Sequence, residues 1–131
     1  MRDKKNILLV REDLCKVVEF AQKCVEAGID ETDIFATIDS SDIIRFLNTK
    51  AISTVIIDSD LYNLNTASIL KQYSQFQNIQ ILLITDSKAK KTIRMIMDKN
   101  LKYLNPGICP SDLAKIIVPF EVPVLKKVAH F

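Results

Sequence analysis

Four short apolar runs in the sequence are each followed directly by polar side chains that could do chemistry together. These side chains are Arg11, Glu12 and Asp13 after the first run, Asp58 after the second, Thr85 after the third, and Asn105 after the fourth. Two carboxylates and a hydroxyl suit Mg²⁺, and Glu12 beside Asp58 could recruit such a cation. The alternative is that Asp58 only caps the turn that follows its run.

The runs and the segments between them predict the elements that position these residues. Short continuous apolar runs are typical of buried parallel strands, and apolar residues at helical spacing indicate helices. We expect strands at Ile7–Val10, Ile34–Ile38, Thr54–Asp58, Ile79–Ile84 and Lys102–Leu104, and helices from Leu14 to about Gly28, from Asp42 to about Asn48, at Ala67–Tyr73, around Ile93, Ile96 and Met97, and at Asp112–Val118. This alternation predicts an α/β fold, a doubly wound five-stranded parallel sheet with helices on both faces. The carboxyl ends of the strands would then share one crevice.

Length and charge limit the domain organisation and the partners. The chain has 131 residues, of which 48% are apolar and 26% charged, which is enough for one packed core. We expect one domain over residues 1–118 and an apolar tail over residues 119–131, packed on the domain or on a partner such as a second copy. A net charge of +2 argues against binding of nucleic acid or membranes by bulk electrostatics.

The scarcity of certain residue types argues against several classes of enzyme. His130 is the single histidine, and the three cysteines, at positions 15, 24 and 109, leave no zinc tetrad. Two glycines leave no glycine-rich phosphate loop. We therefore expect no enzymatic activity. The cysteines lie within apolar patterns, which predicts buried free thiols, and no signal-peptide pattern is present, so we expect a cytoplasmic protein.

The segment after the third predicted strand carries the most specific motif. Asp58-Ser59-Asp60-Leu61-Tyr62-Asn63-Leu64-Asn65-Thr66 resembles the Asp-x-x-Leu-Pro-x-Met-Asp-Gly loop of response-regulator receiver domains, the CheY-like family of two-component signalling. Tyr62 and Thr66 stand where the family has Pro and Gly. Thr85 matches the Thr/Ser of the fourth strand, and Tyr103 lies near the aromatic residue of the fifth. The resemblance covers about residues 5–118 and implies a flavodoxin-like, CheY-like (βα)₅ fold.

The resemblance also implies roles for individual residues. They are Asp58 as phosphoacceptor, Thr85 as switch hydroxyl, Tyr103 as switch aromatic, and Glu12, Asp13 and Asp58 as ligands of Mg²⁺. A histidine kinase or phosphotransfer protein would supply the phosphoryl group. An output partner would bind the face of the fourth helix and fifth strand, whose cations Lys88, Lys90, Lys91 and Arg94 could instead form a plain solvated surface.

Two departures from the family pattern change the expected chemistry. Arg11 replaces the first acid after strand one, which weakens Mg²⁺ binding, and Asn105 replaces the lysine before Pro106. We hypothesise that Arg11 reaches Asp58 and supplies the positive charge that metal and lysine supply elsewhere.

Three functional hypotheses follow. The first is a receiver that accepts phosphate poorly or with altered requirements. The second is a pseudo-receiver that acts as an interaction module without phosphorylation. The third, a flavodoxin-like or cobalamin-type small-molecule binder, is disfavoured because the chain lacks a Ser/Thr/Gly-rich phosphate loop and an Asp-x-His-x-x-Gly motif.

Overall fold

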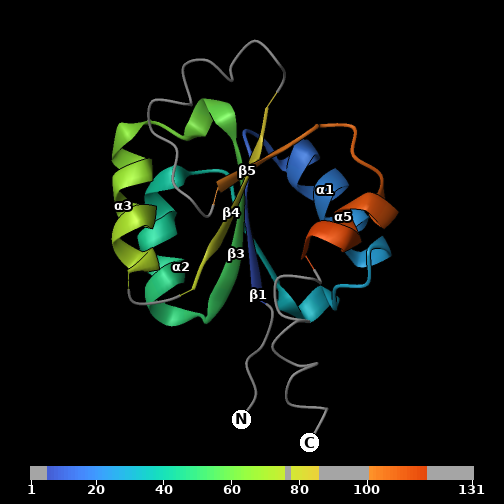
Figure 1. The fold of residues 1–131 in the computed structure, drawn as a ribbon, viewed down its shortest axis with the longest axis horizontal. Coiled ribbons are helices and arrows are strands. Elements are labelled where there is room, and N and C mark those ends of the chain that lie inside the picture. Colours follow the sequence, from blue (N-terminus) through green and yellow to red (C-terminus); the bar gives the residue numbers. More distant parts are fainter. Residues whose placement is uncertain (1–5, 76–77, 86–100, 118–131) are drawn as a thin grey trace, which may run out of the picture.

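The structure, a computed structural model, describes residues 6–75, 78–85 and 101–117. Its centre is a five-stranded parallel sheet with the strand order β2-β1-β3-β4-β5 (Figure 1). The strands are β1 (Asn6–Val10), β2 (Ile34–Thr37), β3 (Ile52–Asp58), β4 (Gln80–Ile84) and β5 (Leu101–Leu104). The predicted α/β fold with a five-stranded parallel sheet is therefore confirmed.

Helices cover both faces of this sheet. They are α1 (Leu14–Glu26), α2 (Ile43–Thr49), α3 (Leu64–Ser74) and α5 (Pro110–Ile117). Figure 1 shows α2 and α3 on one face and α1 and α5 on the other. The helix expected around Ile93, Ile96 and Met97, the cations at positions 88–94 and the tail at 119–131 lie outside the described residues.

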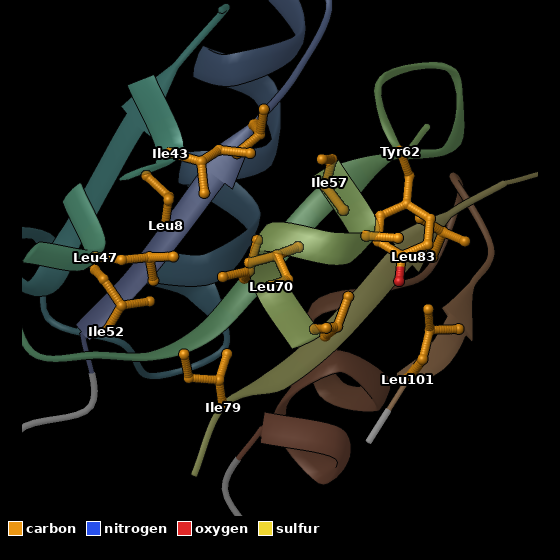
Figure 2. Close-up of a cluster of buried hydrophobic side chains, with 14 residues drawn as sticks. Leu8, Ile43, Leu47, Ile52, Ile57, Tyr62, Leu70, Ile79, Leu83 and Leu101 are labelled. Atoms are coloured by element: carbon orange, nitrogen blue, oxygen red, sulfur yellow. The ribbon is translucent and has the colours of Figure 1, made fainter. Parts of the chain in front are cut away.

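The strands are apolar runs because they are buried on both faces. Leu8 and Val10 of β1 enter a core cluster with α2 and α3, whereas Ile7 and Leu9 enter a second cluster with α1 and α5. Figure 2 shows the first cluster, in which Tyr62 lies beside Leu83. Tyr62 is 4% exposed, so this residue, one of the two that depart from the receiver-domain motif, is part of the core.

Several helix boundaries differ from the prediction. Asn63, expected in a loop, accepts a hydrogen bond from the backbone N–H of Thr66, and α3 therefore begins at Leu64. Helix α5 begins at Pro110, two residues before the expected start, since proline is tolerated in a first turn. Single 3₁₀ turns, which were not predicted, lie at Glu31–Asp33, Ser40–Asp42 and Ser59–Leu61.

Two further observations concern expected properties of the chain. All three cysteines are free thiols, as predicted, but only Cys24 is buried, and Cys15 and Cys109 are exposed. Burial raises the pKa of the Cys24 thiol to about 12. None of the helices that the structure describes is long and apolar enough to cross a membrane.

Candidate functional site

A hollow of about 410 Å³ opens at the carboxyl ends of β1, β3 and β4. Its lining residues come from the β1–α1 connection, one side of α1, the start of the β3–α3 connection, the end of β4 and the turn after β5. They are Arg11, Glu12, Lys16, Glu19, Phe20, Lys23, Asp58, Ser59, Asp60, Ile84, Thr85 and Pro106. The shared crevice predicted for Glu12, Asp58 and Thr85 is thus present.

The floor of the hollow is an ion pair between Arg11 and Asp58. The Arg11 Nε donates to Asp58 Oδ2 at 2.9 Å, and the backbone N–H of Glu12 donates to the same oxygen at 3.0 Å. The two side chains are only 9% and 10% exposed. The hypothesis that Arg11 reaches Asp58 is therefore confirmed as a contact.

The Arg11 guanidinium is held from other directions as well. Its carbon lies 5.4 Å from the centre of the Phe20 ring, and Lys23 Nζ lies 5.2 Å from the same centre. Both distances suit cation–π attraction. Lys23 also donates to the carbonyl of Pro106 at 3.4 Å, which connects α1 to the turn after β5. Phe20 and Lys23 were not predicted as site residues.

A second, more exposed charged group lies at the rim. Lys16 Nζ pairs with Glu12 Oε1, and the two side chains are 42% and 34% exposed. A hydrogen bond from the Lys16 ammonium and a second one with Asp60 lower the pKa of Glu12. The hydrogen bond with Glu12 raises the pKa of Asp60. Lys16 and Asp60 were not predicted as site residues. The four-residue spacing of Glu12 and Lys16, which favours helical ion pairs, was an available signal for Lys16.

Thr85 and Tyr103, the two predicted switch residues, have different surroundings. Thr85 is 5% exposed and lines the hollow, and its backbone N–H donates to the carbonyl of Leu104 at 3.1 Å. Tyr103 of β5 is partly buried against the cluster under α2 and α3 and does not line the hollow. The two residues therefore lie close to each other in the fold, but Thr85 lines the hollow and Tyr103 packs against the core under α2 and α3.

Two predicted site residues have local structural roles instead. Asp13 accepts the backbone N–H of Lys16 at 2.9 Å and caps α1. Asn105 accepts the backbone N–H of Gly107 at 2.8 Å in an exposed turn and does not line the hollow. Carboxylate and amide oxygens near free backbone N–H groups readily cap turns and helices, which explains both corrections.

The expected Mg²⁺ site does not fit the residues present. Within the described part of the chain, no three Asp, Glu, His or Cys side chains group closely enough to hold a metal ion. Asp13 caps its helix, Glu12 pairs with Lys16, and Asp58 pairs with Arg11. A guanidinium therefore contacts the carboxylate that a metal would need.

The comparisons with known proteins bear on the fold. No protein-family model matches the sequence, and no curated protein sequence matches it. A CheY-like receiver domain protein of Methanospirillum hungatei is similar in structure, with a TM-score of 0.68 at 12% identity over 95% of this chain and 98% of that one.

Two further solved structures are similar to the same extent. The N-terminal domain of an uncharacterized protein of Wolinella succinogenes has a TM-score of 0.68 at 18% identity, over 95% of this chain and 98% of that one. The chemotaxis protein CheY4 of Vibrio cholerae has a TM-score of 0.66 at 15% identity, over 88% and 98%. The chain thus has the fold of CheY-like receiver domains.

Proposed function

We propose that this protein is a receiver-like signalling domain that acts as a protein-interaction module without accepting a phosphoryl group. The observation that carries the proposal is the buried pair of Arg11 and Asp58 at 2.9 Å. The proposal includes a non-enzymatic role and a reducing, cytoplasmic setting, which the three free cysteines support.

The pair argues against phosphoryl transfer because it occupies one oxygen of the nucleophile and neutralises its charge. Oδ2 of Asp58 already accepts two hydrogen bonds, from the Arg11 side chain and from the backbone of Glu12. Two unit charges about 4 Å apart attract by about 4 kcal/mol at an effective dielectric near 20, so Arg11 stabilises the carboxylate before any reaction. An interaction that stabilises the ground state as strongly as the transition state does not speed the reaction.

A second candidate function is a receiver in which Asp58 accepts phosphate at a reduced rate. It is supported by Asp58 and Thr85 lining one hollow with three cations, Arg11, Lys16 and Lys23. These cations could stabilise charge on the transferred oxygens, which is the main requirement of phosphoryl transfer. This candidate needs a histidine kinase or phosphotransfer protein and keeps Thr85 and Tyr103 as switch residues.

Beryllofluoride separates the two candidates. We expect that adding Mg²⁺ with beryllofluoride leaves the backbone amide shifts of Asp58, Thr85 and Tyr103 unchanged, because Arg11 holds the Asp58 carboxylate. Saturable shifts at all three, in a folded protein, would establish the phosphate-accepting receiver instead. A phosphodonor such as acetyl phosphate, followed by intact-mass measurement, gives an independent readout of the same question.

Restoring the family residues provides the converse test. The double variant Arg11→Asp with Asn105→Lys should bind Mg²⁺ more tightly and take up phosphate from a small donor, because it removes the guanidinium and adds the missing ammonium. Arg45→Asp changes the same charge on the exposed surface of α2 and serves as the control. No gain over this control would contradict the interpretation that Arg11 and Asn105 weaken Mg²⁺ binding and phosphate uptake.

The output surface of the proposed module remains a prediction. The face expected from the resemblance combines the fourth helix with β5, and only β5 belongs to the described residues. Lys102 of that strand is exposed, so it adds a positive charge to this face. A partner with acidic side chains is the one this face would suit.

A further inference from the structure

Exposed apolar side chains gather around the β2 edge of the sheet. Among the strands that the structure describes, β2 has β1 as its one neighbour and stands last in the strand order. The residues next to it with large exposed apolar side chains are Leu14, Val18 and Val25 of α1, Ile38 directly after β2, and Ile44 of α2. We call these five residues the β2-edge patch. Leu64 of α3 is the only other large hydrophobic residue exposed in the described part of the chain.

The packing of α1 against β2 places the patch residues of α1 beside β2. Ala21 of α1 packs in the same core cluster as Ile34 and Ala36 of β2. Leu14, Val18 and Val25 lie seven, three and four residues from Ala21, so they share its side of the helix. Leu14 and Val18 are each 66% exposed, although both are apolar residues at helical spacing. Their stripe therefore borders β2 without being covered.

Two hydrogen bonds tie the segments before Leu14 and before Ile44 to the end of β2. The backbone N–H of Arg11 donates to the carbonyl of Thr37 at 3.2 Å, and the Thr37 hydroxyl donates to Asp42 Oδ2 at 2.9 Å. The first bond fixes the loop that leads into Leu14, and the second fixes the turn that leads into Ile44. The backbone of Arg11 therefore binds the end of β2, and the side chain of Arg11 binds Asp58.

The chain segment on either side of β2 carries acidic side chains, although the Lys50 ammonium lies 5.2 Å from the ring centre of Phe35 in β2. Between Lys23 and Arg45 the chain carries six acidic side chains and no basic one. These acids are Glu26, Asp30, Glu31, Asp33, Asp39 and Asp42, so they lie before and after β2 and at the end of α1. Hydrogen bonds from the backbone and from the side chain of Ser41 lower the pKa of Asp39. Arg45 lies 3.6 Å from Asp42 and compensates one of them in part.

We propose that the β2 edge binds an extended segment of a partner protein as a sixth strand, with apolar residues along β2 and Lys or Arg at both ends. This inference rests on the proposed interaction role and names its surface and partner chemistry. Patch residues on α1 and on α2 flank opposite faces of the sheet, so an added strand would cover both with alternating side chains. The cationic ends would meet the acids that border β2.

A second copy of this chain fits the edge less well. Two-fold pairing of two β2 strands is antiparallel, and it would bring the acids before one strand against the acids after the other. Like charges opposed in this way weaken the contact. The apolar edge with acidic ends therefore selects a basic partner over itself.

The probe for the test is a synthetic peptide in which a run of alternating Val and Ile, as long as the four residues of β2, is flanked by lysine pairs. We expect saturable changes in the backbone amide shifts of Ile34–Thr37, weakened by added salt. A control peptide that differs only in having proline in place of one central residue should not bind, because proline cannot complete a strand ladder. Equal binding of the proline peptide would overturn the added strand.

Matched surface variants of the protein complete the experiment. Val18→Ser and Ile38→Ser should each weaken peptide binding about tenfold, since each removes apolar area that the peptide would cover. Leu64→Ser, an equally exposed position on α3, should leave binding unchanged. Unchanged binding in both patch variants, no binding to the wild type, or self-association through β2 without peptide would each overturn the proposal. Beryllofluoride shifts at Asp58 test the proposed function separately, because they do not depend on the peptide.

Discussion

Two ion pairs lie in the hollow at the carboxyl end of the sheet, and they differ in their exposure to solvent. Arg11 and Asp58 have side chains that are 9% and 10% exposed, whereas Lys16 and Glu12 are 42% and 34% exposed. The buried pair has lost most of its hydration, so each charge depends on the other. The exposed pair can exchange its partner for water. The same attraction therefore fixes the floor of the hollow but leaves the rim adjustable.

Replacing Arg11 is the strongest test of the difference between the buried and the exposed ion pair. Arg11→Met should lower the free energy of unfolding by about 3–5 kcal/mol at neutral pH, because it leaves the buried Asp58 carboxylate without its cationic partner. Urea denaturation followed by circular dichroism measures the loss. Lys16→Met is the matched control, and it should leave the unfolding midpoint almost unchanged. Losses of equal size in the two variants would contradict the distinction between floor and rim.

Removing both members of the buried pair sharpens the same comparison. Asp58→Asn in the Arg11→Met background should restore at least about 2 kcal/mol of the lost stability, because no uncompensated charge then remains. The carboxamide oxygen of the new side chain can still accept the backbone N–H of Glu12. The four unfolding curves of the double-mutant cycle give the coupling between the two residues. A simple sum of the two single losses would show that the pair does not act as a unit.

The floor of the hollow was predictable from the sequence, and much of the rim was not. Arg11 and Asp58 each follow a short apolar run, and such runs become neighbouring parallel strands that end at the same edge. Their contact follows from register alone. Asp13 and Asn105, which do not line the hollow, have side chains that suit a ligand and a cap equally well, and the choice depends on which backbone N–H groups lie nearby.

Helix α1 shows a second limit of prediction. Its apolar spacing indicates a helix but does not say which apolar residues the core has room for. The core accepts Phe20 and Cys24 and leaves Leu14 and Val18 exposed. Which stripe of a helix is buried depends on the position of its neighbours, here β2 and α5, and this information is not local in the sequence.

The rim carboxyls give the smallest effect, and its sign depends on pH. The pKa of Glu12 is lowered, chiefly by Lys16, so its contribution to stability is present above its ordinary pKa of 4.5 and is lost as pH falls through the lowered value. The pKa of Asp60 is raised above 3.8 by the hydrogen bond with Glu12, so its contribution is present below 3.8 and is lost as pH rises through the raised value. Ionised Asp60 therefore opposes folding slightly at neutral pH.

Asp60→Asn should consequently be slightly more stable than the wild type at pH 7 and equal to it below about pH 3.8, the ordinary value for an aspartate. The amide of the new side chain can still donate to Glu12, so the geometry is kept. Melting temperatures at several pH values in low salt measure the difference, which added salt should reduce because both groups are exposed. Glu26→Gln, which changes an exposed acid of α1 outside the hollow, is the control. A difference that persists at low pH would contradict a proton shared between Asp60 and Glu12, and the rim would then resemble the floor.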